Sequence, residues 1–141
     1  MVKYSKATNY ALHTMVFLSA AETKKATGVE ELAKRQELSP SYLSKILTKL
    51  VKAGLIESSP GANGGYLLKK SADDISFLDV IEAIEGASSM FSCSMSHEHS
   101  GHSRGCLIAE VMTSAEDKMK QHLEEKKISH VTPKMREHLK K

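Results

Sequence analysis

The chain has 141 residues, of which 40% are hydrophobic and 26% charged, values typical of one small globular domain with or without an oligomerisation arm. Its two cysteines exclude a disulfide-stapled secreted scaffold, and no apolar run approaches the ~18 residues of a membrane span, so we expect a soluble cytoplasmic protein. Residues 1–70 hold 11 Lys and Arg against 5 Asp and Glu, whereas residues 71–141 hold 9 against 12. This asymmetry favours a polyanion as the partner of the first half.

The basic half begins with two predicted helices separated by a polar loop. Apolar residues at helical spacing predict a first helix from Lys6 to about Ala21. Thr27 precedes Glu30 by three residues, which is the spacing of a capping box. This spacing predicts a second, short helix over residues 29–36.

A third helix is predicted to begin at Ser39 and Pro40, because serine suits the N-cap and proline the first helical position. Gly54 is expected to end it as a left-handed cap. One face is apolar and is expected to be buried; it comprises Leu43, Ile46, Leu47, Leu50 and Val51. The opposite face carries hydroxyl and ammonium groups and no acid; it comprises Ser41, Ser44, Lys45, Thr48, Lys49 and Lys52.

A short hairpin is predicted after the third helix. Residues 55–58 and 66–69 read as strands, and the glycine-rich run from Ser59 to Gly65 is a strong turn signal. Two helices joined by a tight turn and followed by such a hairpin predict a winged helix-turn-helix. The predicted class is therefore mainly α with a small β-hairpin wing, and residues 1–86 are expected to form a DNA-binding domain.

The predicted contacts to double-stranded DNA lie at the start of the third helix and in the wing. A helix fits the major groove and its first turns reach deepest, while glycines let the wing backbone approach phosphate or the minor groove. A solvated helix face and a plain hairpin turn are the alternatives for each element taken alone. The candidate contacts are Ser39, Ser41, Tyr42, Lys45 and Lys49 of the helix, and Asn63 and Gly64 of the wing.

The acidic half is expected to open with a fourth helix. Ser76 and Asp79 have the spacing of a second capping signal, and Gly86 marks the end of that helix. Residues 87–105 then form a polar loop rich in Ser, His and Met.

A long helix is predicted to begin at Cys106. It carries a heptad-like apolar stripe from Ile108 to Leu123, and a lone helix of this kind has no partner within a small domain. We therefore expect it to pair with its copy in a homodimer. Residues 106–141 would then comprise the dimerisation helix and a tail, with a short terminal helix over 132–141.

Several motifs carry a resemblance to a known family. They are Tyr10-Ala11-Leu12, Leu38-Ser39-Pro40-Ser41-Tyr42-Leu43, Leu50-Val51-Lys52-Ala53-Gly54-Leu55-Ile56 and Pro60-Gly61-x-x-Gly64-Gly65-Tyr66-Leu67-Leu68. With them, residues 1–125 resemble the IscR/NsrR-type transcriptional regulators, the Rrf-two family. The resemblance implies a homodimeric bacterial regulator, here expected to be a repressor, that binds palindromic operators. It also implies a loop before the dimer helix that in many members senses iron–sulfur status, nitric oxide or oxidants through a cluster.

The candidate sensor residues begin with Cys93 and Cys106. Cluster-binding members of the family typically supply three cysteines from this loop, and this chain has two, so a three-cysteine site is excluded. Two thiolates with imidazoles suit a two-iron two-sulfur cluster, because His can replace Cys on one iron. The same ligands suit tetrahedral zinc. Without metal, the two cysteines could form a reversible disulfide.

Histidines are the other candidate ligands. In some relatives with few cysteines, first-helix residues of the partner subunit complete the cluster, and His13 fits that role by position. Its companion one turn earlier is Asn9, a poor ligand, so the fourth ligand stays open among His97, His99 and His102. A hydrogen-bonded interface histidine is the alternative for His13, and a solvated loop is the alternative for the other three.

The sequence contains no motif that supports catalysis, since it has no glycine-rich phosphate loop after a buried strand, no nucleophile elbow and no paired acids in a predicted cleft. The predicted function is a dimeric DNA-binding transcriptional regulator. A winged-helix module that docks a protein partner such as a metabolic enzyme is the rival, and a small metal-dependent enzyme is the third reading.

Overall fold

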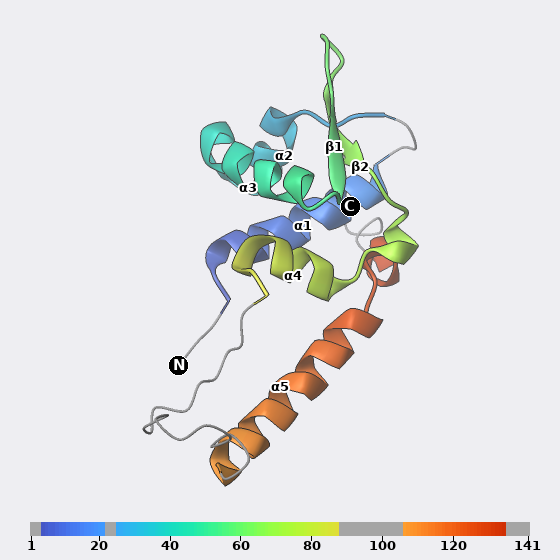
Figure 1. The fold of residues 1–141 in the computed structure, drawn as a ribbon. Coiled ribbons are helices and arrows are strands. Elements are labelled where there is room, and N and C mark those ends of the chain that lie inside the picture. The colour runs from blue at the N-terminus through green and yellow to red at the C-terminus, as the bar shows by residue number, and fades with distance from the viewer. Residues whose placement is uncertain (1–3, 22–24, 88–105, 135–141) are drawn as a thin grey trace.

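A computed structural model describes residues 4–21, 25–87 and 106–134, and within them the chain is mainly helical with one two-stranded antiparallel sheet (Figure 1). This is the predicted fold class. The elements are α1 (Lys6–Ala20), α2 (Val29–Arg35), α3 (Pro40–Lys52), β1 (Ile56–Ser59), β2 (Gly65–Leu68), η1 (Ala72–Asp74), α4 (Phe77–Glu85), α5 (Leu107–Glu125) and η3 (Ile128–His130). None of the helices in these ranges has the length and apolar character that crossing a membrane requires.

The core lies between α1, α3 and α4, with the first strand and η3 closing its sides. The apolar face of α3 enters it through Leu43, Ile46, Leu47 and Leu50, as predicted. The predicted burial of Val51 is wrong, since this side chain is 37% exposed. At 3.6 residues per turn Val51 lies about a quarter turn from the centre of the buried stripe. The polar face of α3 is thereby directed outward.

The start of α2 differs from its predicted capping box. Its N-cap is Gly28, and no side chain caps the helix. Thr27 instead pairs with Tyr66 of β2, each N–H donating to the other's carbonyl at 2.9 and 2.8 Å. The pairing needs a glycine at position 65, where φ is +149° and a Cβ would lie 2.3 Å from the Thr27 carbonyl oxygen. A tertiary contact that ties α2 to the wing therefore replaces the local cap.

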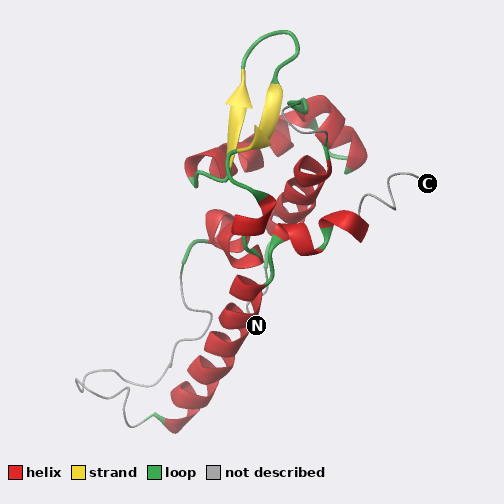
Figure 2. Ribbon diagram, turned by 90° about the vertical axis from the view of Figure 1, so that its right-hand side faces the viewer, coloured by secondary structure: helices red, strands yellow, loops and turns green. Residues whose placement is uncertain are grey.

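The hairpin forms as predicted, with each strand displaced by one residue. β1 and β2 pair in a register that sets Ile56 opposite Leu68 and Ser59 opposite Gly65. Before β1, Gly54 ends α3 with φ +79°, as expected of a left-handed cap. The hairpin projects from the helical body (Figure 2), which is the form of a wing.

In the described part of the second half of the chain, α4 packs on the body and α5 extends away from it. The predicted capping box of α4 is present, with Ser76 and Asp79 exchanging backbone-to-side-chain bonds of 3.0 Å. α5 extends away from the body, and its C-terminal end lies nearest to it (Figures 1 and 2). That end is fixed by main-chain pairing, in which the Phe77 N–H donates to Lys126 at 2.8 Å and the Ile128 N–H to Ile75 at 2.9 Å.

The segment after α5 packs against the first half of the molecule. Ile128 in η3 is fully buried in the core, and the Thr132 and Ser19 hydroxyls lie 2.6 Å apart. The C-terminal part of the predicted terminal helix, from residue 135, lies outside the described residues. The anchored tail fixes the direction of α5 relative to α3 and the hairpin.

Candidate nucleic-acid interface

The outward face of α3 is built from its first turn. The hydroxyl of Ser39 accepts the Tyr42 N–H at 3.2 Å, which fixes where the helix starts. All five predicted α3 contacts are exposed: Ser39, Ser41, Tyr42, Lys45 and Lys49. Within the described residues, neither lysine lies within ion-pair distance of a carboxylate. The face therefore presents hydroxyl and ammonium groups that can donate to base edges and phosphates.

Tyr42 is held from one side. Its ring meets the ring of Tyr10 on α1 edge-to-face, with centroids 6.0 Å apart and planes at 89°. The Tyr42 side chain is nevertheless 39% exposed. One part of the ring thus faces its neighbour, and another part faces solvent beside the lysines.

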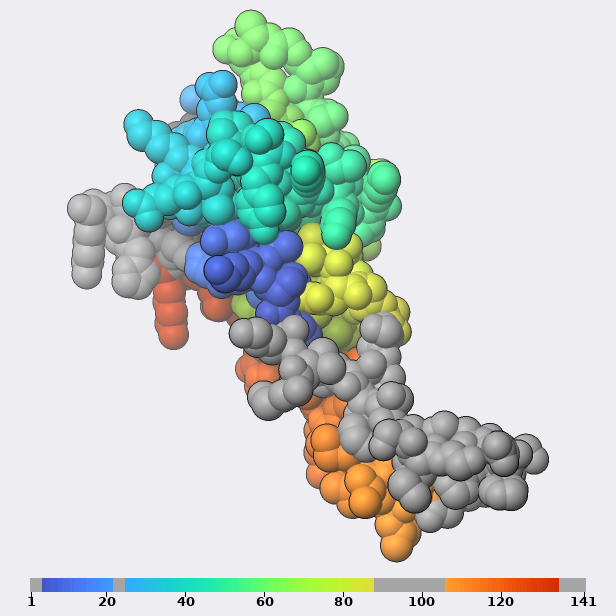
Figure 3. All heavy atoms as spheres, turned by 90° about the vertical axis from the view of Figure 1, so that its left-hand side faces the viewer, coloured from blue at the N-terminus to red at the C-terminus, as the bar shows by residue number. Residues whose placement is uncertain are grey.

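The wing contributes the second group of candidates. Asn63 is exposed in the turn between β1 and β2. Gly64 is half-buried, and a Cβ there would lie 2.1 Å from the Ser59 carbonyl oxygen, so the turn itself requires glycine at this position. The α3 helix and the wing are exposed on one face of the molecule (Figure 3), and a duplex can contact both.

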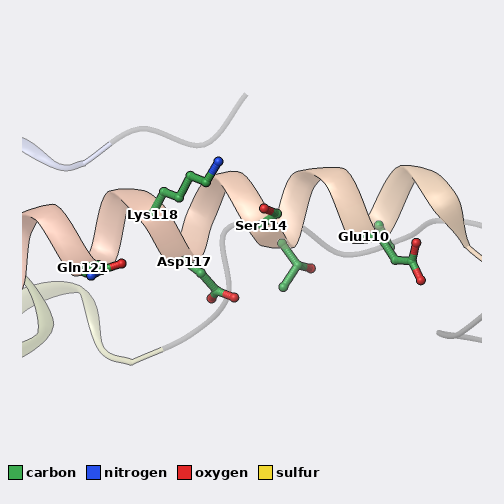
Figure 4. A pocket seen from close by; sticks show the side chains of 7 residues that line it. Glu110, Ser114, Asp117, Lys118 and Gln121 are labelled. Carbon is green, nitrogen blue, oxygen red and sulfur yellow. The ribbon is translucent and has the colours of Figure 1, made fainter.

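The two sides of α5 differ in character. Its N-terminal half exposes large apolar side chains, with Leu107 72%, Ile108 70% and Val111 68% exposed. The polar side chains Glu110, Asp117 and Gln121 lie on the side of the helix opposite Ile108, whereas Ser114 and Lys118 follow Leu107 and Val111 along it (Figure 4). The N-terminal part of the predicted stripe, at Ile108 and Met112, therefore faces solvent in the single chain, whereas Met119 and Leu123 are half-buried.

Among the candidate sensor residues, Cys106 and His13 are described. Cys106 is the N-cap of α5, where its Sγ accepts the Ala109 N–H at 3.3 Å. His13 is exposed on α1, and its Nδ1 lies 2.8 Å from the Asn9 carbonyl oxygen. Because a carbonyl only accepts, Nδ1 donates in this contact, which directs Nε2, the other possible metal ligand, away from the helix backbone.

The single chain does not bring these two residues together. The N-terminal end of α5 lies far from α1 in both ribbon views (Figures 1 and 2). Across the described ranges, no three His, Cys, Asp or Glu side chains gather as metal ligands. The other candidates, Cys93, His97, His99 and His102, lie outside the described residues.

Glu85, which the sequence analysis does not single out, joins α4 to α1. Its carboxylate accepts the Thr8 hydroxyl and the Ser5 N–H, both at 2.6 Å. These bonds, the Thr8 bond first, lower the pKa of Glu85, and the charge of Lys49 on α3 lowers it further. An acid at a helix C-terminus opposes the helix dipole, and that misfit is the sequence signal that could have found it.

Comparison with known proteins identifies one family of transcriptional regulators. The sequence profile of the Rrf2 family, described as an iron-dependent transcriptional regulator, matches residues 4–134. YwgB of Bacillus subtilis (strain 168) is provisionally named an HTH-type transcriptional regulator. It is 34% identical to this chain over 132 residues, which cover 92% of this chain and 84% of YwgB. The HTH-type transcriptional regulator NsrR of Geobacillus kaustophilus is 34% identical over 90 residues, 64% of this chain and 61% of its own. These relatives are named as regulators and not as enzymes.

Solved structures show the same fold. CymR, the global cysteine regulator of B. subtilis, has a TM-score of 0.74 and 26% identity, with 94% of this chain and 98% of that chain covered. The oxidized form of Staphylococcus aureus CymR has a TM-score of 0.73 and 27% identity, with 93% and 96% covered. An IscR from T. potens has a TM-score of 0.75 at 24% identity, with 97% and 90% covered, and shares the winged fold.

Proposed function

The chain belongs to the Rrf2 family of DNA-binding transcriptional regulators, and on this premise we propose that it is a homodimeric repressor of palindromic operators. The observation that carries the proposal is the outward face of α3, which is exposed, lysine-bearing and free of acids. In a dimer, each subunit lays this face in a major groove, and the two half-sites lie about 34 Å apart along one side of the duplex.

Each part of the interface has a distinct role in this proposal. Ser39, Ser41 and Tyr42 lie in the first turn of α3 or at its cap, which reaches deepest, and they contact base edges or nearby phosphates. Lys45 and Lys49 follow along the helix and neutralise phosphates. The wing residues Asn63 and Gly64 bring backbone and an amide group to the flanking groove.

The dimer forms through α5. Burial of the exposed apolar side chains of its N-terminal half against their copies supplies the driving force, at about 25 cal/mol per Å² of apolar surface removed from water. Because main-chain hydrogen bonds fix the C-terminal end of α5 to the body, the pairing of two such helices sets the distance between the two α3 helices. A change at the α5 pair therefore alters how the dimer matches the operator.

The loop that precedes α5 is the proposed sensor. Cys93 and Cys106 of one subunit, with His13 of the second subunit, would hold an iron–sulfur cluster, and His97, His99 or His102 would complete it. The residues described fit this role, since Cys106 sits at a helix N-terminus, which favours an anionic group, and His13 keeps Nε2 for a ligand. A cluster would supply a group whose charge and ligation respond to oxidants or nitric oxide. Zinc, or a disulfide between the two cysteines, is the alternative sensor chemistry.

Operator binding is tested by selecting duplexes from a random-sequence pool with the intact protein. The proposal predicts an inverted repeat with half-sites about one helical turn apart, and inserting half a turn between them should weaken binding more than 10-fold. Selection of a single asymmetric half-site, or indifference to the insertion, would contradict the dimeric mode of binding.

The sensor is tested on protein purified without oxygen, by visible absorbance with iron, sulfide and zinc analysis. The proposal predicts iron and sulfide that are lost in Cys93→Ser and Cys106→Ser and reduced in His13→Ala. His122→Ala, an exposed histidine of α5, serves as the matched control and should retain the wild-type content. Zinc in place of iron selects the zinc alternative, and metal-free protein that still responds to oxidant selects the disulfide.

A further inference from the structure

We propose that Tyr10 of α1 is a positioning residue for DNA recognition: its ring holds Tyr42 in the orientation in which that side chain meets the duplex. This inference rests on the proposed function, in which Tyr42 is a DNA contact. Tyr10 belongs to another helix and is not part of the proposed contact surface, so its role would be to act through Tyr42 alone.

The geometry of the two rings is that of a favourable aromatic pair. Their centroids are 6.0 Å apart and their planes are at 89°, so the positive edge of one ring meets the negative face of the other. Tyr10 is partly buried and packs against the core, whereas Tyr42 is 39% exposed. The Tyr10 ring is therefore held by the core, and the Tyr42 ring lies between Tyr10 and solvent.

Tyr42 needs this support because its helix fixes its backbone but not its ring. The Ser39 cap holds the Tyr42 N–H at 3.2 Å, which sets the Cα position. An exposed aromatic side chain can still change rotamer, and ordering it on binding costs conformational entropy. A neighbouring ring that selects one rotamer beforehand lowers this cost and strengthens binding.

The support is itself rigid. Thr8, one half-turn before Tyr10, is fully buried, and its hydroxyl donates to Glu85 of α4 at 2.6 Å. The Ser5 N–H at the start of the same helix donates to the same carboxylate at 2.6 Å. The segment of α1 that carries Tyr10 is thus bonded to α4, and the ring has a fixed base from which to hold Tyr42.

A double-mutant cycle on operator affinity tests the pair. The variants are Tyr10→Leu, Tyr42→Leu and both together, with Tyr10→Phe as the conservative variant that keeps the ring. The probes are a duplex selected by the wild-type protein from a random pool and a mixed-sequence duplex. Tyr10→Leu is expected to weaken binding to the selected duplex roughly 3- to 10-fold, the range that one aromatic pair provides.

The same loss should be absent when Tyr42 is already leucine, and Tyr10→Phe should bind like the wild type. Binding to the mixed-sequence duplex should be weakened less by Tyr10→Leu, because the lysines that contact phosphates are untouched. A merely structural role would instead weaken binding equally in both Tyr42 backgrounds and on both duplexes, and that result overturns the inference.

The outcomes also separate this inference from the proposed function. Weaker binding by Tyr42→Leu without any effect of Tyr10→Leu overturns the positioning role alone. Unchanged binding by Tyr42→Leu overturns both the positioning role and the proposed Tyr42 contact.

Discussion

The charge of Glu85 is unfavourable at the end of its own helix, α4, and favourable beside the start of α1. It is the last residue of α4, where the partial charge of the helix end is negative. The carboxylate instead accepts bonds from Ser5 and Thr8 at the N-terminus of α1, where the helix dipole is positive. One side chain thus joins two helices, and it does so directly before the proposed sensor loop.

The pH dependence of stability reports on this contact. The Thr8 and Ser5 bonds hold the pKa of Glu85 below its ordinary value of 4.5. The stabilisation is therefore present above pH 4.5 and is lost as pH falls through the lowered pKa of the folded protein. Glu85→Gln should lower the free energy of unfolding by a few tenths to about 1 kcal/mol at pH 7, since solvent screens a part-exposed carboxylate.

This difference from the wild type should vanish below the lowered pKa, as measured by chemical denaturation across pH. Glu57→Gln, an exposed carboxyl on β1, is the control and should track the wild type throughout. A stability difference that is independent of pH would show that the charge of Glu85 is not the cause.

Gly65 is required by the pairing between α2 and the wing. Its φ of +149° and the Thr27 carbonyl oxygen, 2.3 Å from any added Cβ, both oppose a side chain. Gly65→Ala should therefore destabilise the protein by about 2 kcal/mol or more. Gly61→Ala, with φ +103° but open space around it, should cost about 1 kcal/mol. Thermal unfolding and the amide exchange of Tyr66 measure both, and equal losses would show that the clash with Thr27 plays no part.

At the scale of elements, α5 is the helix whose surface least suits a single chain. Its N-terminal half exposes Leu107, Ile108 and Val111, while its C-terminal end is pinned by Ile128 in the core. An exposed apolar surface of this kind is typical of an interaction site and fits the proposed dimer.

Charges placed on this apolar half should break the proposed dimer without unfolding the body. Ile108→Asp with Val111→Asp should weaken dimerisation about 100-fold or more, because each copy would have to bury two carboxylates. The same residues are exposed in the single chain, so circular dichroism should be unchanged. Sedimentation equilibrium measures the effect, with Thr113→Asp, on the opposite side of α5, as the control. Wild-type association by the double variant would mean that this half of α5 is not the interface.

The sequence predicts those elements whose signals are local. The Ser39 cap, the α3 stripe, the left-handed Gly54 and the Ser76–Asp79 capping box each lie within one element, and the structure contains all four except for the burial of Val51 in the stripe. Thr27 has the right spacing for a cap, but a contact with Tyr66 on a distant strand outweighs it. Periodicity likewise does not reveal the Tyr10–Tyr42 pair, the Glu85 bonds or the burial of Ile128, because each depends on how helices meet in three dimensions.

At the scale of the whole molecule, the distribution of charge matches the proposed separation of DNA binding from dimerisation. The basic half of the sequence forms α1 to β2, with α3 and the wing on one face (Figure 3). The acidic half forms α4 and α5, which lie below that face. Such a separation draws a polyanion toward α3 and keeps it from α5, and it makes association strongly dependent on ionic strength.

The salt dependence of duplex binding tests most directly whether the outward face of α3 lies against DNA. The logarithm of the affinity falls with the logarithm of salt concentration by about 0.9 for each phosphate contact. In a dimer, Lys45→Glu with Lys49→Glu removes two contacts per subunit, so the slope should become shallower by about 3 to 4. Lys118→Glu with Lys126→Glu makes the same charge change on exposed lysines of and after α5 and should keep most of the wild-type slope. If instead the α3 variant keeps the wild-type slope, or the α5 variant loses as much, then α3 does not lie against the duplex.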